Sequence, residues 1–197
     1  MNKNIFTLLL FCLLFLGCQE KQTLIVTPSD INKSIGKAEF YDGDLLVASY
    51  DVLLGRSGVS AQKREGDGNT PSGEYEISAV FGKQNFGITS MPFIKTSKDI
   101  HCVDDINSEH YNKIIDSKIV PKDYVSFEEM LRDDGLYDMG SVVKYNHGNI
   151  KGLGSCIFLH IKSDKPTAGC ISMDAKDLKE LLLRLDSRKN PTVKINP

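Results

Sequence analysis

The stretch Cys156-Ile-Phe-Leu-His160-Ile-Lys-Ser-Asp-Lys-Pro-Thr167-Ala-Gly169-Cys170-Ile-Ser172-Met173 contains the most informative pattern in the chain. An apolar run ends at a histidine, a short polar loop follows, and a cysteine comes directly after a glycine. A thiol attacks only as the thiolate, and a neighbouring imidazole is the usual means of producing one at neutral pH. The glycine allows a substrate backbone to approach the sulfur and leaves backbone amides free to hold an oxyanion. The stretch therefore predicts acyl transfer by a Cys170–His160 pair.

Short apolar runs in the rest of the chain predict a mainly β domain. The strand candidates are residues 23–26, 37–41, 45–54, 74–81, 91–95, 141–145 and 156–161. The last of these is apolar on both faces, so we expect it deep in the sheet. Asp42-Gly43-Asp44 predicts a hairpin turn. We expect residues 96–125 to form a long irregular insertion.

Two segments have helical patterns. Ser126-Phe-Glu-Glu129 matches a capping box and predicts a short helix ending near Arg132. Asp174 can cap a longer helix, because four leucines follow it at i, i+3, i+4 and i+7. That stripe predicts core packing against the sheet; it comprises Leu178, Leu181, Leu182 and Leu185.

The N-terminus predicts an exported protein. Lys3 precedes an apolar run over residues 5–16, which is typical of a signal peptide and too short for an ordinary membrane-spanning helix. Leu14-Phe-Leu-Gly-Cys18 resembles a bacterial lipobox, in which the cysteine is lipidated and becomes the new N-terminus. We therefore expect a signal peptide over 1–17, a lipid-anchored tether over 18–22 and a catalytic domain over 23–197. An ordinary signal peptide cut nearby is the alternative.

This organisation sets the expected location and excludes some partners. We expect the protein in the cell envelope, held at a membrane through Cys18 and facing the periplasm, with the outer membrane favoured. Without residues 1–17 the chain has 23 basic and 26 acidic side chains, a net charge of −3. That balance excludes strong electrostatic binding to nucleic acid or to an anionic membrane surface.

Three cysteines lie beyond the lipobox, and an odd number leaves at least one free thiol. With Cys170 as nucleophile, Cys102 and Cys156 either pair or remain separate, and we expect two buried thiols. A zinc site formed by Cys156, His160 and Cys170 is the competing reading. On one strand the first two would lie about 13 Å apart, too far to share an ion. We expect no metal and no organic cofactor.

Two motifs together resemble the L,D-transpeptidase family (the YkuD-type catalytic domain). The first is the strand ending in His160 with Thr167-Ala-Gly169-Cys170-Ile171 after it. The second is the segment 66–75, whose Gly-Asp-Gly-Asn-Thr-Pro-Ser-Gly-Glu-Tyr sequence resembles a family hairpin. The resemblance covers roughly residues 23–196. It implies a β-sandwich with a helix after the catalytic cysteine loop.

The resemblance also implies a reaction on peptidoglycan stem peptides. His160 would take the Cys170 proton, and the thiolate would attack an amide carbonyl beside a diaminopimelate residue. Backbone amides near Gly169 would stabilise the oxyanion, with Thr167 and Ser172 as substrate contacts. An amine from another stem or from a protein would then resolve the thioester.

Several alternatives remain open. Ser172 replaces a larger polar residue common in the family, so water could resolve the thioester, as in an L,D-carboxypeptidase or murein hydrolase. A non-catalytic wall-binding lipoprotein is a further alternative. His147 is a rival base, although its surroundings read as an exposed turn. For Asp104, Asp105 and Asp116 we expect a solvated acidic surface; positioning of the substrate amine is the alternative role.

Overall fold

A computed structural model describes residues 20–30, 33–87 and 89–197 and confirms the mainly β prediction. Its elements are β1 (Gln22–Pro28), β2 (Ile35–Asp42), β3 (Leu45–Leu53), β4 (Val59–Ser60), β5 (Thr70–Pro71), β6 (Gly73–Gly82), β7 (Phe93–Lys95), β8 (Ile100–Val103), β9 (Ile114–Asp116), β10 (Phe127–Glu129), β11 (Met139–Val143), β12 (Phe158–Ile161), β13 (Ile171–Met173), α1 (Ala175–Arg184), the 3-10 helix η1 (Ser187–Lys189) and β14 (Thr192–Ile195).

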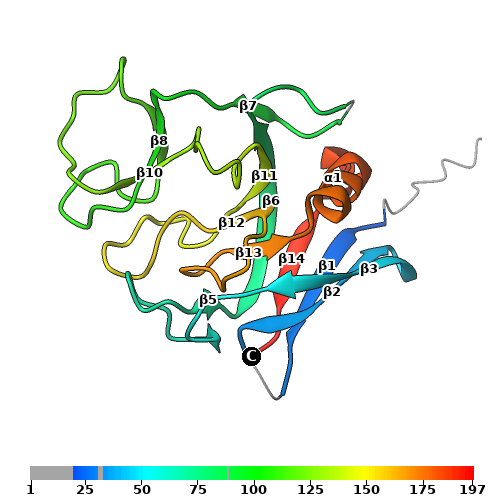
Figure 1. The fold of residues 1–197 in the computed structure, drawn as a ribbon. Coiled ribbons are helices and arrows are strands. Elements are labelled where there is room, and N and C mark those ends of the chain that lie inside the picture. The colour runs from blue at the N-terminus through cyan, green and yellow to red at the C-terminus, as the bar shows by residue number, and fades with distance from the viewer. Residues whose placement is uncertain (1–19, 31–32, 88) are drawn as a thin grey trace, which may run out of the picture.

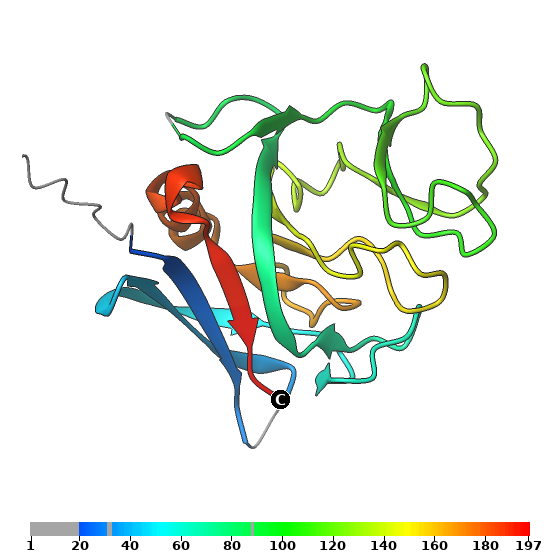
Figure 2. The same cartoon turned by 180° about the vertical axis from the view of Figure 1, so that it is seen from behind.

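The main sheet closes on itself. Its strand order is β11-β12-β13-β3-β2-β1-β14-β6-β7, and β6 also pairs with β11. Eight strands therefore form a ring, and β7 extends it at β6 (Figure 1). A three-stranded sheet, β10-β8-β9, lies beside β12 on the side away from β1–β3 (Figure 2). The expected β-rich fold is therefore present as a main sheet that closes into a ring.

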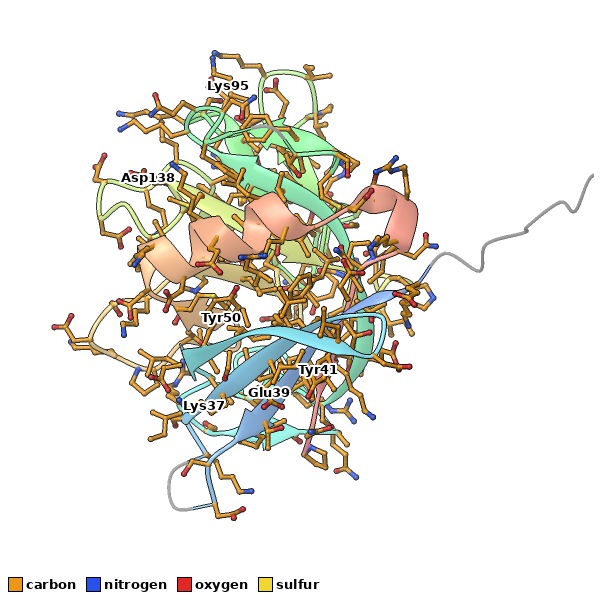
Figure 3. The ribbon with its side chains drawn as sticks, turned by 90° about the vertical axis from the view of Figure 1, so that its right-hand side faces the viewer. Lys37, Glu39, Tyr41, Tyr50, Lys95 and Asp138 are labelled. Carbon is orange, nitrogen blue, oxygen red and sulfur yellow. A yellow bond between two sulfur atoms is a disulfide. The ribbon has the colours of Figure 1, made fainter. Side chains whose placement is uncertain are left out.

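The predicted hairpin joins β2 and β3 through Gly43, which has a φ of 61°. Alternation along β2 explains its two faces: Ala38 and Phe40 are buried in the core. Lys37, Glu39 and Tyr41 occupy the alternate positions, as Figure 3 shows. This period of two is the expected signature of a strand with one face on the core.

The predicted C-terminal helix is confirmed as α1. Leu178, Leu181 and Leu182 are fully buried in the main core. Asp174 precedes the helix, but its side chain makes no capping hydrogen bond and instead pairs with Lys162 at 2.8 Å. The leucine stripe, rather than the cap, fixes the helix on the sheet.

The predicted helix over residues 126–132 is wrong, because this segment contains the strand β10. Phe127 pairs with Val103 of β8, and its ring stacks on His101 with the ring centroids 4.0 Å apart. Tertiary pairing outweighs the local capping pattern here. The insertion over 96–125 is consequently more ordered than expected, since β8 and β9 lie within it.

The predicted strand 156–161 is shorter than expected, and the expectation of two buried thiols is wrong. β12 begins at Phe158, and Cys156 lies before it in irregular structure with a positive φ of 52°. Cys156 is disulfide-bonded to Cys102 of β8. The disulfide joins the small sheet to the segment that leads into β12.

At the N-terminus, β1 begins at Gln22, one residue before the expected domain boundary. The proposed signal peptide and Cys18 lie outside the described residues. No helix in residues 20–30, 33–87 and 89–197 is long and apolar enough to cross a membrane.

Candidate active site

Cys170 and His160 line one cavity of about 320 Å³. His160 lies on β12, and Cys170 immediately precedes β13, which runs parallel to β12. Thr167 and Ser172 line the same cavity, together with Glu128, Arg132 and Tyr137 from the segment after β9. The pairing of these two neighbouring strands thus brings the sequence-predicted pair into one cavity.

The Cys170 thiol is buried and is held by backbone groups. Its sulfur accepts a hydrogen bond from the Phe158 N–H at 3.3 Å and donates one to the Cys156 carbonyl oxygen at 3.3 Å. No hydrogen bond joins the thiol to the imidazole in the described part of the chain. Contacts of this kind are often long in a resting site and shorten when substrate binds.

Burial and the nearby Glu128 carboxylate raise the pKa of the Cys170 thiol well above its ordinary value. The Phe158 N–H, the Tyr137 hydroxyl and the Lys63 ammonium oppose this shift but are weaker. The Cys170 thiol is therefore neutral at rest, and an attack by its sulfur would require proton transfer.

The His160 ring is oriented so that its Nε2 could accept a proton. Its Nδ1 lies 2.7 Å from the carbonyl oxygen of Ile161, which can only accept, so Nδ1 carries the proton. Nε2 of the neutral ring is then the acceptor. Burial lowers the pKa of His160 to about 4, so the ring is neutral at physiological pH. The backbone carbonyl of Ile161 is the orienting group that the sequence did not identify.

The loop before Cys170 is fixed by two threonines. The Thr167 hydroxyl donates to the Cys170 carbonyl at 2.6 Å and accepts from the Gly169 N–H at 3.1 Å. The Thr70 hydroxyl also donates to the Cys170 carbonyl, at 3.4 Å, and accepts from the Gly55 N–H. The Gly-rich segment recognised in the sequence is thus part of the support for the catalytic loop.

Gly169 is required by close packing. Its φ is 155°, and a Cβ there would lie 2.9 Å from the carbonyl oxygen of Asn69. The Gly169 N–H is occupied by Thr167, whereas the N–H groups of Ala168 and Cys170 have no acceptor among the described residues. Of these two amides, that of Cys170 belongs to the residue that carries the sulfur, so it is the candidate for binding an oxyanion.

Ser172 lies opposite His160 in the β12–β13 register and is fully buried. Its hydroxyl has no hydrogen-bond partner among the described residues. Ala168 is exposed at the rim of the same cavity. Ser172 and Ala168 thus present only a small hydroxyl and a methyl group on this wall.

Tyr137 and Glu128 are site residues that sequence reasoning missed. The Tyr137 hydroxyl donates to the Glu128 carboxylate, and its ring packs edge-on against His160 at 5.2 Å between centroids. The Arg132 guanidinium lies 5.3 Å from the centre of the Tyr137 ring. Glu128 was not recognised as a site residue from the sequence, because it lies in a pattern that resembles a helix capping box.

A second cavity of about 170 Å³ shares Glu128, Ala168 and Cys170 with the first. Its other lining residues include the charged side chains Arg56, Lys63, Glu65 and Asp104. Cys170 therefore lies where two cavities meet.

The rival groups lie elsewhere. His147 is exposed and lines a cavity that does not include Cys170. Asp105 accepts hydrogen bonds from the backbone of Asn107 and Val125, and Asp116 accepts one from Lys118. Cys156 cannot bind a metal while it is in the disulfide. No three His, Cys, Asp or Glu side chains among the described residues converge as metal ligands.

Comparison with known proteins identifies the family of the chain. The model of the YkuD family, the L,D-transpeptidase catalytic domain, matches residues 29–195. Searches of curated proteins and of solved structures gave no significant match. Since the matched range spans most of the chain and includes both Cys170 and His160, the protein belongs to the L,D-transpeptidase catalytic-domain family.

Proposed function

We propose that the protein is a cysteine acyltransferase that forms an L,D-peptide bond between peptidoglycan stem peptides. The observation that supports this most strongly is the pairing in one cavity of Cys170 with a neutral His160 whose Nε2 is free to accept a proton. Membership of the family supports peptidoglycan as the substrate class.

In the proposed reaction, His160 Nε2 takes the thiol proton as Cys170 attacks the carbonyl after a diaminopimelate residue. The Cys170 N–H stabilises the oxyanion. The C–N bond breaks, the imidazolium gives its proton to the departing D-amino acid, and a thioester remains on Cys170. An acceptor amine then attacks this thioester, and the thiol is restored.

We also propose that lipidation of Cys18 holds the domain at a membrane facing the periplasm. The support is the short apolar run followed by Gly17-Cys18 in the sequence. The acceptor, either another stem or an amine on a protein, would then lie in the cell wall.

The test is incubation of purified protein with muropeptides, followed by mass spectrometry. Cross-linked dimers are expected from the wild type. Trimmed monomers would instead identify a carboxypeptidase or hydrolase, and an unchanged mixture would identify a wall-binding protein. A carbapenem should add one adduct to the wild type and none to Cys170→Ala; an adduct that persists in this variant would contradict the assignment of the nucleophile.

A further inference from the structure

The second cavity has an acidic wall beside the nucleophile. Glu65, Asp104 and Glu128 contribute three carboxyl groups to it, against the cations of Lys63 and Arg56. Lys63 is buried and already paired with Asp67 at 2.7 Å. The Arg56 guanidinium donates to the Gly66 carbonyl at 3.3 Å, at the surface. Neither cation neutralises this wall by a direct ion pair.

The three carboxyl groups differ in the hydrogen bonds that their oxygens accept. Glu65 accepts from the hydroxyls of Tyr111 and Ser155, each at 2.6 Å. Oδ1 of Asp104 is buried and has no hydrogen-bond partner among the described residues. A buried acceptor without a donor is costly, so this wall is suited to a ligand that donates hydrogen bonds. Asp104 therefore has two properties expected of an amine-binding group: a carboxylate charge, and an acceptor oxygen, Oδ1, without a donor among the described residues.

The electrostatics favour a cation in the same place. Burial raises the pKa of Asp104, and repulsion from Glu65 and Asp105 adds to the shift. An ammonium group would relieve this repulsion and would supply N–H donors. A metal ion fits less well, because no three ligand-type side chains in the described ranges converge to hold one.

Transfer to an amine needs a base that acylation does not. An amine of ordinary pKa, about 8 to 10, arrives as an ammonium ion and must lose a proton before it can attack. His160 handles the proton that passes between the sulfur and the nitrogen, so the additional proton of the ammonium ion needs a second acceptor. Glu128 lines both cavities together with Cys170.

We propose that Glu128 is the general base for the acceptor, and that Asp104 binds the same ammonium group in the second cavity. The inference rests on the proposed function and identifies the acceptor as a cationic amine. Glu128 takes one proton from the ammonium ion. The neutral nitrogen forms its bond to the thioester carbonyl, the C–S bond breaks, and the second nitrogen proton passes through His160 to the departing sulfur. Glu128 then releases its proton to water.

The groups around Glu128 suit this role. Burial raises the pKa of Glu128 to about 7, with repulsion from Asp104 and Glu65 adding to the shift, while the Tyr137 hydroxyl and Arg132 oppose it. The neighbouring Cys170 is a neutral thiol at rest, so it places no charge beside Glu128. A carboxylate that ionises near neutrality is a stronger base than an ordinary one and is still ionised above pH 7.

The experiment separates the two half-reactions in purified full-length protein. The donor is a synthetic tetrapeptide stem ending in diaminopimelate–D-alanine, and the acceptors are meso-diaminopimelate and hydroxylamine. Hydroxylamine is uncharged at neutral pH and needs no prior deprotonation. Mass spectrometry follows both the acyl-enzyme and the products. Glu129→Gln is the matched control, because Glu129 is the exposed neighbour of Glu128 on β10.

Glu128→Gln should form the acyl-enzyme at least as fast as wild type, because the Glu128 carboxylate raises the pKa of the Cys170 thiol. It should still transfer the acyl group to hydroxylamine. Transfer to diaminopimelate should fall by about 10²–10⁴-fold, and the rise of this rate through pH 7 should disappear. Asp104→Asn should raise the KM for diaminopimelate more than it lowers kcat. Equal loss with both acceptors, or normal transfer to diaminopimelate, would overturn the role of Glu128. Failure of the wild type to form any acyl-enzyme would instead overturn the proposed function on which this inference rests.

Discussion

The Cys156 carbonyl oxygen accepts a hydrogen bond from the Cys170 thiol at 3.3 Å, and the side chain of the same Cys156 is bonded to Cys102. Cys102 in turn pairs in register with Glu128 across β8 and β10. One covalent bond therefore connects the residue that positions the sulfur with β8, and β8 pairs with the strand that carries the proposed acceptor base.

Removal of this disulfide should reduce both stability and activity. The double variant Cys102→Ala/Cys156→Ala should lose about 2–4 kcal/mol of unfolding free energy, because the bond closes a long loop in the unfolded chain. Acylation should also slow, since the carbonyl next to the sulfur is less constrained. Urea unfolding and carbapenem acylation measure the two effects. Wild type treated with a reductant should behave like the variant; an unchanged urea midpoint in both would contradict the prediction.

His160→Ala should lose far more acylation than His147→Ala. General-base assistance contributes about 10²–10⁴-fold, equivalent to about 3–5 kcal/mol in the barrier. His147 is exposed in a turn away from Cys170 and should contribute little. The rate of carbapenem acylation measures this, with circular dichroism to show that both variants are folded. A near-normal His160→Ala with an inactive His147→Ala would reverse the assignment.

Glu128 should make stability depend on pH. Its pKa is raised to about 7 by burial, so the folded state favours the protonated form. Its stabilising contribution is fully present below about pH 4.5, the ordinary glutamate range, and is lost as pH rises through about 7. Glu128→Gln should therefore gain stability relative to wild type over this window, by at most about 3 kcal/mol.

Urea unfolding at pH 5, 6, 7 and 8 gives this comparison directly. The titration of His160 falls in an overlapping window but is common to both proteins and cancels in the difference. Glu129→Gln should show no such trend. A constant difference between Glu128→Gln and wild type across these pH values would show that Glu128 has an ordinary pKa.

Cys18→Ser should release the protein from membranes. Several acyl chains anchor far more firmly than one, because each buried methylene contributes about 0.8 kcal/mol. Wild type should partition into the detergent phase, and the variant into the aqueous phase with its catalytic rates unchanged. N-terminal analysis of wild type should find lipidated Cys18; an unmodified N-terminus at another residue would identify an ordinary secreted enzyme.

Sequence periodicity predicted the parts of the fold that depend on local pattern. The β2–β3 hairpin and α1 follow from alternation, a glycine turn and a leucine stripe. The same reasoning failed for residues 126–132, where pairing with β8 decides the structure. It also missed the disulfide, because Cys102 and Cys156 lie 54 positions apart and meet through the packing of the small sheet, and Cys156 has a positive φ that no local signal indicates.

The candidate site divides in the same way. Cys170, His160 and Gly169 stand out because each is chemically distinctive within one short stretch. Tyr137, Glu128 and the carbonyl of Ile161 could not be identified, since their roles arise from contacts between elements. Asp104 could be named as a candidate for amine binding but not separated from Asp105 and Asp116, because only its side chain lines the cavity beside the sulfur.

The position of β14 in the ring determines at what point during synthesis the candidate site can assemble. β14 pairs in parallel with β1 and antiparallel with β6, so the last strand of the chain fills the gap between two much earlier ones. Contacts of such long sequence separation form slowly. The ring cannot close until Thr192–Ile195 have been synthesised, so a shorter nascent chain lacks the closed ring that contains β12 and β13. The proposed acyl transfer would therefore have to wait until synthesis has passed β14.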